Sequence, residues 1–209
     1  MSGEIQTIDA KTASAFLLPK HYSGRKPQIS KAFGLFSGGE MVAVCTFGKP
    51  ASNSLCVGIC GKEFSKNVYK LNRLCRRDEW DEPLSSFVSG CLRILKKENW
   101  IIVSYADRGM NHNGYIYQAT NFLYTGATVK RTDKYTEGNK HSRHYDKDAT
   151  EVYRKVRTSK HRYVYFCTSH KPTKKLWTKC LNYKVMPYPK EKNETYTLGE
   201  YQEQEIIKV

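Results

Sequence analysis

The stretch SYADRGMNHNGYIYQATNFLYTG, residues 104–126, decides the fold class of this chain. Its first residues complete WIIVSYA (100–106), a continuous apolar run that is typical of a strand buried on both faces of a sheet. Asp107 follows that run, a polar loop comes next, and residues 113–122 predict a helix. Ligands of open α/β sheets bind at the carboxyl ends of strands, so the position of Asp107 indicates a functional site. The alternative is an Asp that only caps the following loop.

The segments on either side predict further strands and helices. Two apolar runs around a Gly-Gly turn, AFGLF (32–36) and MVAVCTF (41–47), indicate a β-hairpin. LSSFVSGCLRILKK (84–97) has its apolar residues at helical spacing, with Ser85 or Asp81 as the expected cap. The remaining predicted elements are a helix at 9–18, strands at 69–75, 123–130 and 161–168, and a helix at 172–181. This order predicts an α/β (α+β) domain with a central mixed sheet flanked by helices.

Length and composition indicate one globular domain with an appendage. The chain has 209 residues, of which 39% are hydrophobic and 26% charged, as in ordinary globular proteins. We expect a single domain at 1–190 with a basic insertion at about 131–160. That segment is long for a loop, so we expect it to be functional or to contain short elements of its own. Residues 191–209 are predicted to be an acidic, flexible C-terminal tail.

The charge of the chain is large and unevenly distributed. The formal net charge is +15, and residues 130–190 hold 17 Lys or Arg against 5 Asp or Glu, a net of +12. A basic block of this size is the usual footprint of a phosphate-rich partner. Tyr, His and Arg are interleaved with the Lys, which favours a nucleic acid over a merely solubilising surface.

The cysteines and the hydropathy indicate a reduced, cytoplasmic protein. The seven Cys are odd in number and irregularly spaced, without a zinc-binding pattern, and most lie in apolar runs. Reduced thiols in the core of a cytosolic protein are therefore expected. No signal peptide and no apolar run near 18 residues is apparent, so we expect neither export nor a membrane partner.

Residues close to Asp107 could carry chemistry. His112 titrates near neutrality and could be a general base, although exposed loop histidines are equally common. Asn113 is a good helix N-cap. The predicted helix has a polar face of residues three or four apart: Gly114, Tyr117, Gln118 and Asn121. Such a face could line a cleft, where Tyr117 acts as an acid and Gln118 holds a base edge, or it could simply be a half-buried surface.

Three basic blocks add candidates for contact with nucleic acid. They are HYSGR (21–25), GNKHSRHY (138–145) and SKHRYVYF (159–166). Cations beside aromatic residues favour phosphate contact and base stacking, although one such run is common in unrelated loops. The DNA-binding candidates are Arg25, His141, Arg143, Lys160 and Arg162. A metal could bring His21, His112, Asp107 and His141 together, but no spacing indicates one, and we predict none.

Asp107 followed by GYIYQATNFLYTG resembles the Mom family of bacteriophage DNA-modification proteins. HYSGR, LNRLC, SSFVSGCLRILKK, GNKHSRH, KHRYVYF and YKVMPYPK agree in order, so the resemblance spans roughly residues 17–190. It implies a Gcn5-related N-acyltransferase-like fold. In that superfamily a Tyr of the helix after the fifth strand often serves as general acid, four residues before Gly-Phe. Tyr117 precedes Asn121-Phe122 at this spacing.

The resemblance implies a transferase that attaches a carbamoylmethyl (glycinamide-like) group to N6 of adenine in double-stranded DNA, with an anti-restriction role. Asp107 or His21 would then be the base or orienting group, and Tyr117 the acid. The predicted substrate-binding residues are Tyr115, Gln118, Tyr22, His112 and Asn121. The alternatives are an acyltransferase of the same fold that acts on RNA, tRNA or a protein amine, and a non-catalytic nucleic-acid-binding protein.

The sequence departs from the superfamily where the donor should bind. The acyl-CoA pyrophosphate loop of the superfamily, Gln/Arg-x-x-Gly-x-Gly/Ala, should lie between Cys75 and Leu84, where this chain has RRDEWDEPLSSF. That stretch has no Gly and four acidic residues, whereas a phosphate needs close backbone approach and positive charge. The donor is therefore left open between an acyl-CoA and another glycine-derived group.

Overall fold

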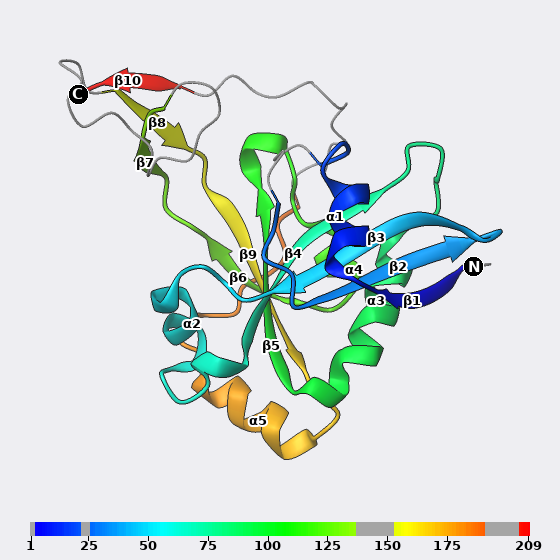
Figure 1. Cartoon of the computed structure of the whole chain (residues 1–209). Helices are drawn as coiled ribbons and strands as arrows, with labels where there is room; N and C mark the ends of the chain where they lie inside the picture. The colour runs from blue at the N-terminus through cyan, green and yellow to red at the C-terminus, as the bar shows by residue number, and fades with distance from the viewer. Residues whose placement is uncertain (1–2, 22–25, 137–152, 191–204) are drawn as a thin grey trace.

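Seven strands form one twisted central sheet in this computed structural model (Figure 1), which describes residues 3–21, 26–136, 153–190 and 205–209. The order across the sheet is β1-β2-β3-β4-β5-β9-β6. The strands are β1 (Glu4–Ile8), β2 (Lys31–Ser37), β3 (Glu40–Gly48), β4 (Val68–Arg76), β5 (Trp100–Asp107), β6 (Leu123–Ala127) and β9 (Lys160–Cys167). Neighbouring strands are antiparallel except for β4 and β5, which are parallel.

Helices cover both faces of this sheet. On one face α3 (Leu84–Leu95) packs with α4 (Tyr115–Ala119) over side chains such as Phe33 and Ile102. The opposite face carries α1 (Ala10–Leu17), α2 (Asn53–Cys60) and α5 (Lys171–Cys180). Neighbouring residues of β5, such as Ile101 and Ile102, enter different clusters because side chains alternate along a strand. The predicted mixed sheet flanked by helices is confirmed.

Local chemistry explains why the predicted elements form. Asp9 caps α1 through hydrogen bonds from the backbone N–H groups of Lys11 and Thr12, at 2.8 and 2.9 Å. The turn between β2 and β3 uses Gly38 and Gly39, whose φ angles are +58° and +85°. The Gly-Gly turn and the two apolar runs thus produce the predicted hairpin.

Some predictions of local structure were wrong. The cap expected at Ser85 or Asp81 does not form: Pro83 occupies the N-cap position of α3, and no side chain caps the helix. The helix expected over 113–122 is confined to Tyr115–Ala119. Asn121 has a left-handed φ of +60° just beyond it, which ends the helix and starts the next strand.

The strands β4 and β5 are paired over only part of their length. Parallel pairing joins Val68–Lys70 to Ile101–Val103; beyond that, β4 pairs only with β3 and β5 only with β9. Successive residues of β3, Phe47 and Thr46, pair with Leu71 and Arg73, so Asn72 is left over as a β-bulge. A bulge bends its strand, which helps β4 turn away from β5. Asn72 accepts a hydrogen bond from Thr46 Oγ1 at 2.5 Å and donates one to the Gln28 carbonyl at 2.7 Å. The sheet therefore parts beside the end of β5.

A small second sheet has the order β10-β8-β7 and projects from the main body at the upper left of Figure 1. Its strands are β7 (Arg131–Lys134), β8 (Tyr153–Arg157) and β10 (Ile206–Lys208). Two of them lie in the predicted basic insertion, and β10 lies in the segment that we expected to be a flexible tail. The division into one domain at 1–190 and a tail stays a prediction.

The cysteines are reduced, as expected. All seven are free thiols, and six of them are buried, with Cys180 half-buried. Within the residues that the structure describes, no helix is long and apolar enough to cross a membrane.

Candidate active site

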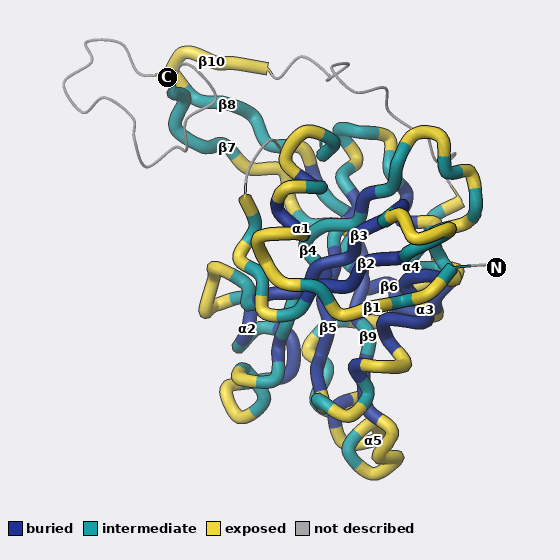
Figure 2. Tube along the Cα trace, turned by 45° about the vertical axis from the view of Figure 1, so that its right-hand side comes forward, coloured by how far each residue is buried: buried dark blue, intermediate teal, exposed yellow. Residues whose placement is uncertain are grey.

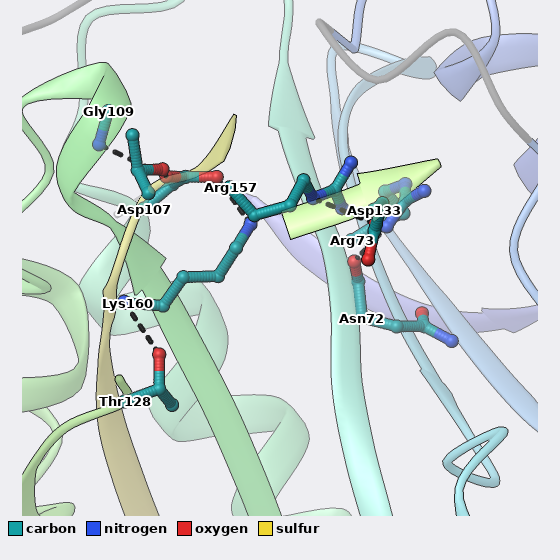
Figure 3. Close-up of polar contacts among 9 residues, drawn as sticks. Asn72, Arg73, Asp107, Gly109, Thr128, Asp133, Arg157 and Lys160 are labelled. Carbon is teal, nitrogen blue, oxygen red and sulfur yellow. Dashed lines mark hydrogen bonds and ion pairs between the residues drawn. The ribbon is translucent and has the colours of Figure 1, made fainter. Parts of the chain in front are cut away.

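Asp107 ends β5 at the place where the sheet parts, and several donors hold its carboxylate (Figure 3). Its Oδ1 accepts hydrogen bonds from the backbone N–H of Gly109 at 3.1 Å and from Thr158 Oγ1 at 2.8 Å. Its Oδ2 forms an ion pair with Lys160, the opposite residue on β9. The capping role that we weighed for Asp107 is thus present, but it uses only part of the carboxylate.

These contacts keep Asp107 ionised. Burial raises the pKa of the carboxyl group, but the hydrogen bond and charge of Lys160, with the bonds from Thr158 and Gly109, outweigh burial and lower the pKa below its ordinary value. A carboxylate of low pKa is a weak base. Asp107 is therefore better suited to orienting neighbours and supplying negative charge than to removing a proton.

The face of the sheet on which Asp107 lies is strongly basic. Alternation along β5 places Tyr105 and Asp107 on the face that carries α2 and α5. Lys70 is on the same face, with its Nζ 5.4 Å from the centroid of the Tyr105 ring. Burial, followed by the charges of Arg73 and Lys160, lowers the pKa of Lys70 to about 8. Asp107 thus pairs with Lys160, and the charge of Lys160 in turn reaches Lys70.

Lys70 and Arg73 were absent from the sequence-based candidates. Both lie within the strand predicted at 69–75, and nothing in the local pattern separates them from surface cations. Their significance comes from the parting of β4 from β5, which is a tertiary feature. Lys70 is the last residue of β4 that pairs with β5. Its importance could have been predicted only from the register of the two strands, which the sequence alone does not give.

His21 and His112 approach the same face. Burial lowers the pKa of His21 to about 3, and the charges of Arg73, His112 and Lys70 act in the same direction. Burial also lowers the pKa of His112, although the Asp107 carboxylate partly opposes it. Both imidazoles are therefore neutral at pH 7.

Tyr117 reaches the parting of the sheet from the opposite face. It packs in the core beneath α3, with ring centroids 5.4 Å from Phe122 and 5.3 Å from Tyr163. Burial raises the pKa of Tyr117 to about 12, partly opposed by a hydrogen bond with the Ser104 side chain. Ser104 also donates to the Leu71 carbonyl at 3.1 Å, across the point where β4 and β5 separate. The Tyr117 phenol is therefore protonated at neutral pH and lies near that opening.

The other residues predicted on α4 have structural contacts or face solvent. Gln118 Nε2 donates to the Asn113 carbonyl and to the Tyr163 hydroxyl, both at 3.2 Å, which attaches the helix to β9. Tyr115 is 61% exposed. Asn121 is also exposed, beyond the end of the helix. The residues expected to form one polar face along a cleft thus have different surroundings. Tyr117 packs against the core, Gln118 attaches the helix to β9, and Asn121 faces solvent.

The predicted phosphate-binding cations have protein partners where the structure describes them. Lys160 pairs with Asp107, and its backbone N–H donates to Thr128 Oγ1 at 2.9 Å. Arg162 donates to Thr125 through Nε and Nη2, each at 2.9 Å, and its Cζ lies 3.4 Å from the centroid of the Tyr183 ring. Four predicted site residues lie outside the described residues: Tyr22, Arg25, His141 and Arg143.

The loop between β4 and α3 does not fit the pyrophosphate of an acyl-CoA. Arg76 donates to the Glu82 carbonyl at 3.4 Å, and Arg77 forms an ion pair with Glu40 at 2.7 Å. Both arginines therefore already have partners, and the acidic side chains of the loop would repel a phosphate. Among the described residues, no group of three or more His, Cys, Asp or Glu side chains is arranged to hold a metal ion.

The architecture matches solved acetyltransferases. A Salmonella typhimurium protein described as an acetyltransferase, with its cofactor acetyl-CoA, superposes with a TM-score of 0.50 and 8% identity, covering 82% of this chain and 97% of that one. An N-acetyltransferase from Staphylococcus aureus has a TM-score of 0.49 and 12% identity, covering 80% and 100% of the two chains. Such identities establish the fold alone, which is that of the Gcn5-related N-acyltransferases.

The sequence comparisons define the family within that fold. The family model described as the Mom protein family matches residues 2–190, and the chain belongs to this family. The methylcarbamoylase mom of Escherichia phage Mu is 26% identical over 128 residues, which are 59% of this chain and 53% of that protein. The match thus spans about half the length of this curated relative. The predicted Mom resemblance is confirmed.

Proposed function

We propose that this protein is a transferase that attaches a carbamoylmethyl group to N6 of adenine in double-stranded DNA. Membership of the Mom family over residues 2–190 supports this proposal, together with the similarity to a methylcarbamoylase of phage Mu. The observation that carries it is that a proton donor and a set of neutral and anionic groups approach the point where β4 and β5 separate from opposite faces of the sheet. A protonated Tyr117 approaches from one face, and neutral imidazoles with an ionised Asp107 lie on the other.

The acceptor nitrogen determines what the site must do. Adenine N6 faces the major groove, but its lone pair is delocalised into the ring, so it is a poor nucleophile that must be aligned and must lose a proton as the new bond forms. Turning the base out of the helix would bring N6 to the site, at a cost of a few kcal/mol. The cationic Lys70, Arg73 and Arg162 on the Asp107 face would attract the phosphate backbone near such a base.

The proposed reaction is a displacement at the methylene carbon of the donor. The bond from N6 to that carbon forms while the bond to the leaving group breaks, and the leaving group departs with the bonding electron pair. His21, neutral at pH 7, accepts the N6 proton as the N6–carbon bond forms, because N6 then gains positive charge and loses its proton even to a weak base. Tyr117 donates a proton to the leaving group. Asp107 orients the site and balances its positive charge. No step is assigned to a coenzyme A pyrophosphate, because the loop before α3 does not fit one.

Mass spectrometry of nucleosides tests the proposal. Genomic DNA from host cells that express the chain should yield a deoxyadenosine derivative in which a carbamoylmethyl group replaces one N6 hydrogen. An Asp107→Ala variant that folds should lose it, because the carboxylate no longer organises Lys160, Thr158 and Gly109. A modification that persists undiminished in Asp107→Ala would contradict the assignment of this site.

The same measurement separates the alternatives. An acyltransferase acting on RNA or on a protein amine would leave DNA unmodified and would label that other acceptor instead. A binding protein without catalysis would leave all acceptors unmodified while still binding DNA in a salt-dependent manner. Unmodified adenine in a competent host that contains soluble, folded protein would overturn the proposed function.

A further inference from the structure

The small sheet of β7, β8 and β10 lacks a fully buried residue. In Figure 2 its strands show no dark-blue segment, and none of their residues is classed as buried. Exposed apolar side chains are present on it, including Ile206, Ile207 and Tyr153. A three-stranded sheet normally needs one covered apolar face for stability. Each described side chain of this sheet therefore keeps some contact with solvent.

The sheet is also strongly basic. Its three strands contain six Lys or Arg and one acidic residue: Arg131, Lys134, Arg154, Lys155, Arg157 and Lys208 against Asp133. Directly paired residues point to the same face of a sheet, so the pairs Arg131↔Arg157 and Asp133↔Lys155 place four of the seven charged residues on one face. Lys208 lies on that face too, because it pairs with Tyr153, two residues from Lys155 on β8. Asp133 Oδ2 lies 3.5 Å from Arg157 Nε (Figure 3). Its Oδ1 lies 3.8 Å from Arg131 Nε, so one carboxylate pairs with two cations.

This sheet is directly joined to the candidate active site. Only Thr158 and Ser159 separate β8 from β9, and Thr158 donates to the Asp107 carboxylate. On the other side, residues 128–130 connect β6 to β7, and Thr128 accepts a hydrogen bond from the Lys160 backbone. Both connections leave the end of the main sheet where Asp107 and Lys160 face each other.

We propose that this sheet is a DNA-reading ribbon that enters the major groove of double-stranded DNA beside the adenine to be modified. The inference rests on the proposed function for the identity of the partner. The five residues of β8 span about 16 Å at the usual rise per residue of a strand. The major groove is about 12 Å wide and about 8.5 Å deep and admits a β-ribbon. The ribbon would hold the DNA while the base reaches Asp107 and Tyr117.

The geometry favours duplex DNA over other nucleic acids. The A-form duplex of RNA has a deep, narrow major groove that protein elements cannot enter. Binding to a single strand would require stacking platforms, and the ribbon elements offer one aromatic side chain, Tyr153, among the described residues. Basic side chains on a projecting, uncovered sheet instead suit phosphates on both sides of a groove.

A charge-removal variant with a matched control tests the ribbon. The ribbon variant is Arg131→Gln with Lys155→Gln and Lys208→Gln, on one face of the small sheet. The control is Lys171→Gln with Lys174→Gln and Lys175→Gln, three exposed cations of α5 on the main body. Both variants change the net charge equally, so a difference between them reports position and not overall charge.

Equilibrium binding to a defined DNA duplex at several salt concentrations gives the readout. Each lost phosphate contact lowers the slope of log K against log salt by about 0.9, so the ribbon variant should lose up to about 2.7 and bind roughly tenfold or more weakly at moderate salt. The α5 variant should keep most of the wild-type slope. Equal slopes for the ribbon variant and the wild-type protein, with both folded, would overturn the proposal.

Two further measurements separate this inference from the proposed function. A duplex whose major groove is filled by glucosylated hydroxymethylcytosine should bind weakly if the ribbon enters that groove. Undiminished binding to it, or preference for duplex RNA, would overturn the ribbon. Nucleoside analysis then tests the chemistry alone. DNA binding that depends on the ribbon, without modified adenine, would refute the transferase and support the ribbon. Modified adenine, with DNA binding by the ribbon variant equal to that of the wild type, would support the transferase and refute the ribbon.

Discussion

Asp107 and Lys160 show how one pair of residues can set the charge of the site. The pair lies at the facing ends of β5 and β9, and Lys160 carries a side chain that is 32% exposed, against 13% for Asp107. Partial exposure weakens the Coulombic attraction, but Thr158 and the Gly109 N–H also hold the carboxylate. Several contacts therefore lower the pKa of Asp107, and the contact with Lys160 has the largest effect among them.

Replacing Lys160 by Met should destabilise the protein at neutral pH by about 1–2 kcal/mol, because a partly buried carboxylate loses its cation. In the wild-type protein the pKa of Asp107 is lower in the folded state, so its contribution is present above the unfolded pKa and is lost as the pH falls through the folded pKa. Denaturant unfolding measured from pH 3 to pH 7 should show this acid loss diminished in the variant. Identical pH profiles would contradict the pairing.

His21 provides a second test at the residue scale. The pKa of His21 is lowered to about 3, so the unfolded chain binds a proton between about pH 6.5 and pH 3 that the folded protein does not. The free energy of unfolding should therefore fall with decreasing pH in this window, by at most about 1.4 kcal/mol per pH unit from this group. A His21→Gln variant should lose that component. A variant whose stability depends on pH as steeply as the wild type would show that His21 is exposed.

Tyr117→Phe tests the proposed proton donor. The ring contacts with Phe122 and Tyr163 remain in this variant, so the unfolding free energy should change little. The rate of adenine modification should fall by about 100- to 10,000-fold if the phenol is a general acid. Tyr165→Phe, which also removes a partly buried hydroxyl from the same core, is the control and should stay active. Full activity of Tyr117→Phe would remove Tyr117 from the mechanism.

At the scale of elements, the approach to α4 depends on a backbone position that only Gly tolerates well. Gly114 has a φ of +84°, and a Cβ there would lie 2.7 Å from Cζ of the Tyr163 ring. Tyr163 is fully buried and accepts the hydrogen bond of Gln118, so it cannot move aside easily. The position of Tyr117, three residues later, therefore depends on Gly114.

Gly114→Ala should lower the free energy of unfolding by about 2–4 kcal/mol, from backbone strain and the clash with Tyr163. Gly39→Ala is the matched control, because Gly39 has a nearly equal φ of +85° and open space around its Cβ position. It should cost only about 1 kcal/mol. Equal effects of the two substitutions in denaturant unfolding would mean that the Tyr163 contact is unimportant.

The sequence predicts the elements whose signal is local. The apolar run of β5, the Gly-Gly hairpin and the periodicity of α3 all follow from short-range patterns. It does not predict β1 or α2, because EIQTI is a short, half-exposed edge strand and NSLCVGIC resembles a strand in composition. Their identity depends on what they pack against.

The candidate site divides in the same way. Asp107 and Tyr117 could be singled out because one ends a buried strand and the other lies in a family motif. Lys70 and Arg73 could not, since their importance depends on the separation of β4 from β5 and on the proximity of Lys160. The partners of Lys160 and Arg162 were likewise unpredictable, because each is made by pairing between strands distant in sequence.

At the scale of the whole molecule, the two faces of the central sheet have different tasks. The face beneath α3 and α4 is an apolar core through which Tyr117 reaches the opening, while the other face presents the cations around Asp107. The small basic sheet continues from the same end of the main sheet (Figure 1). Cations of both sheets are thus gathered near the end of β5 where Asp107 lies.

The most direct test of this account is the nucleoside composition of DNA treated with the protein. DNA from cells expressing the wild-type chain should contain adenine carrying a carbamoylmethyl group, and DNA from cells expressing Tyr117→Phe should contain little of it while the variant remains folded. Wild-type DNA without modified adenine, in a host that produces the modification when given the phage Mu methylcarbamoylase, would contradict the account.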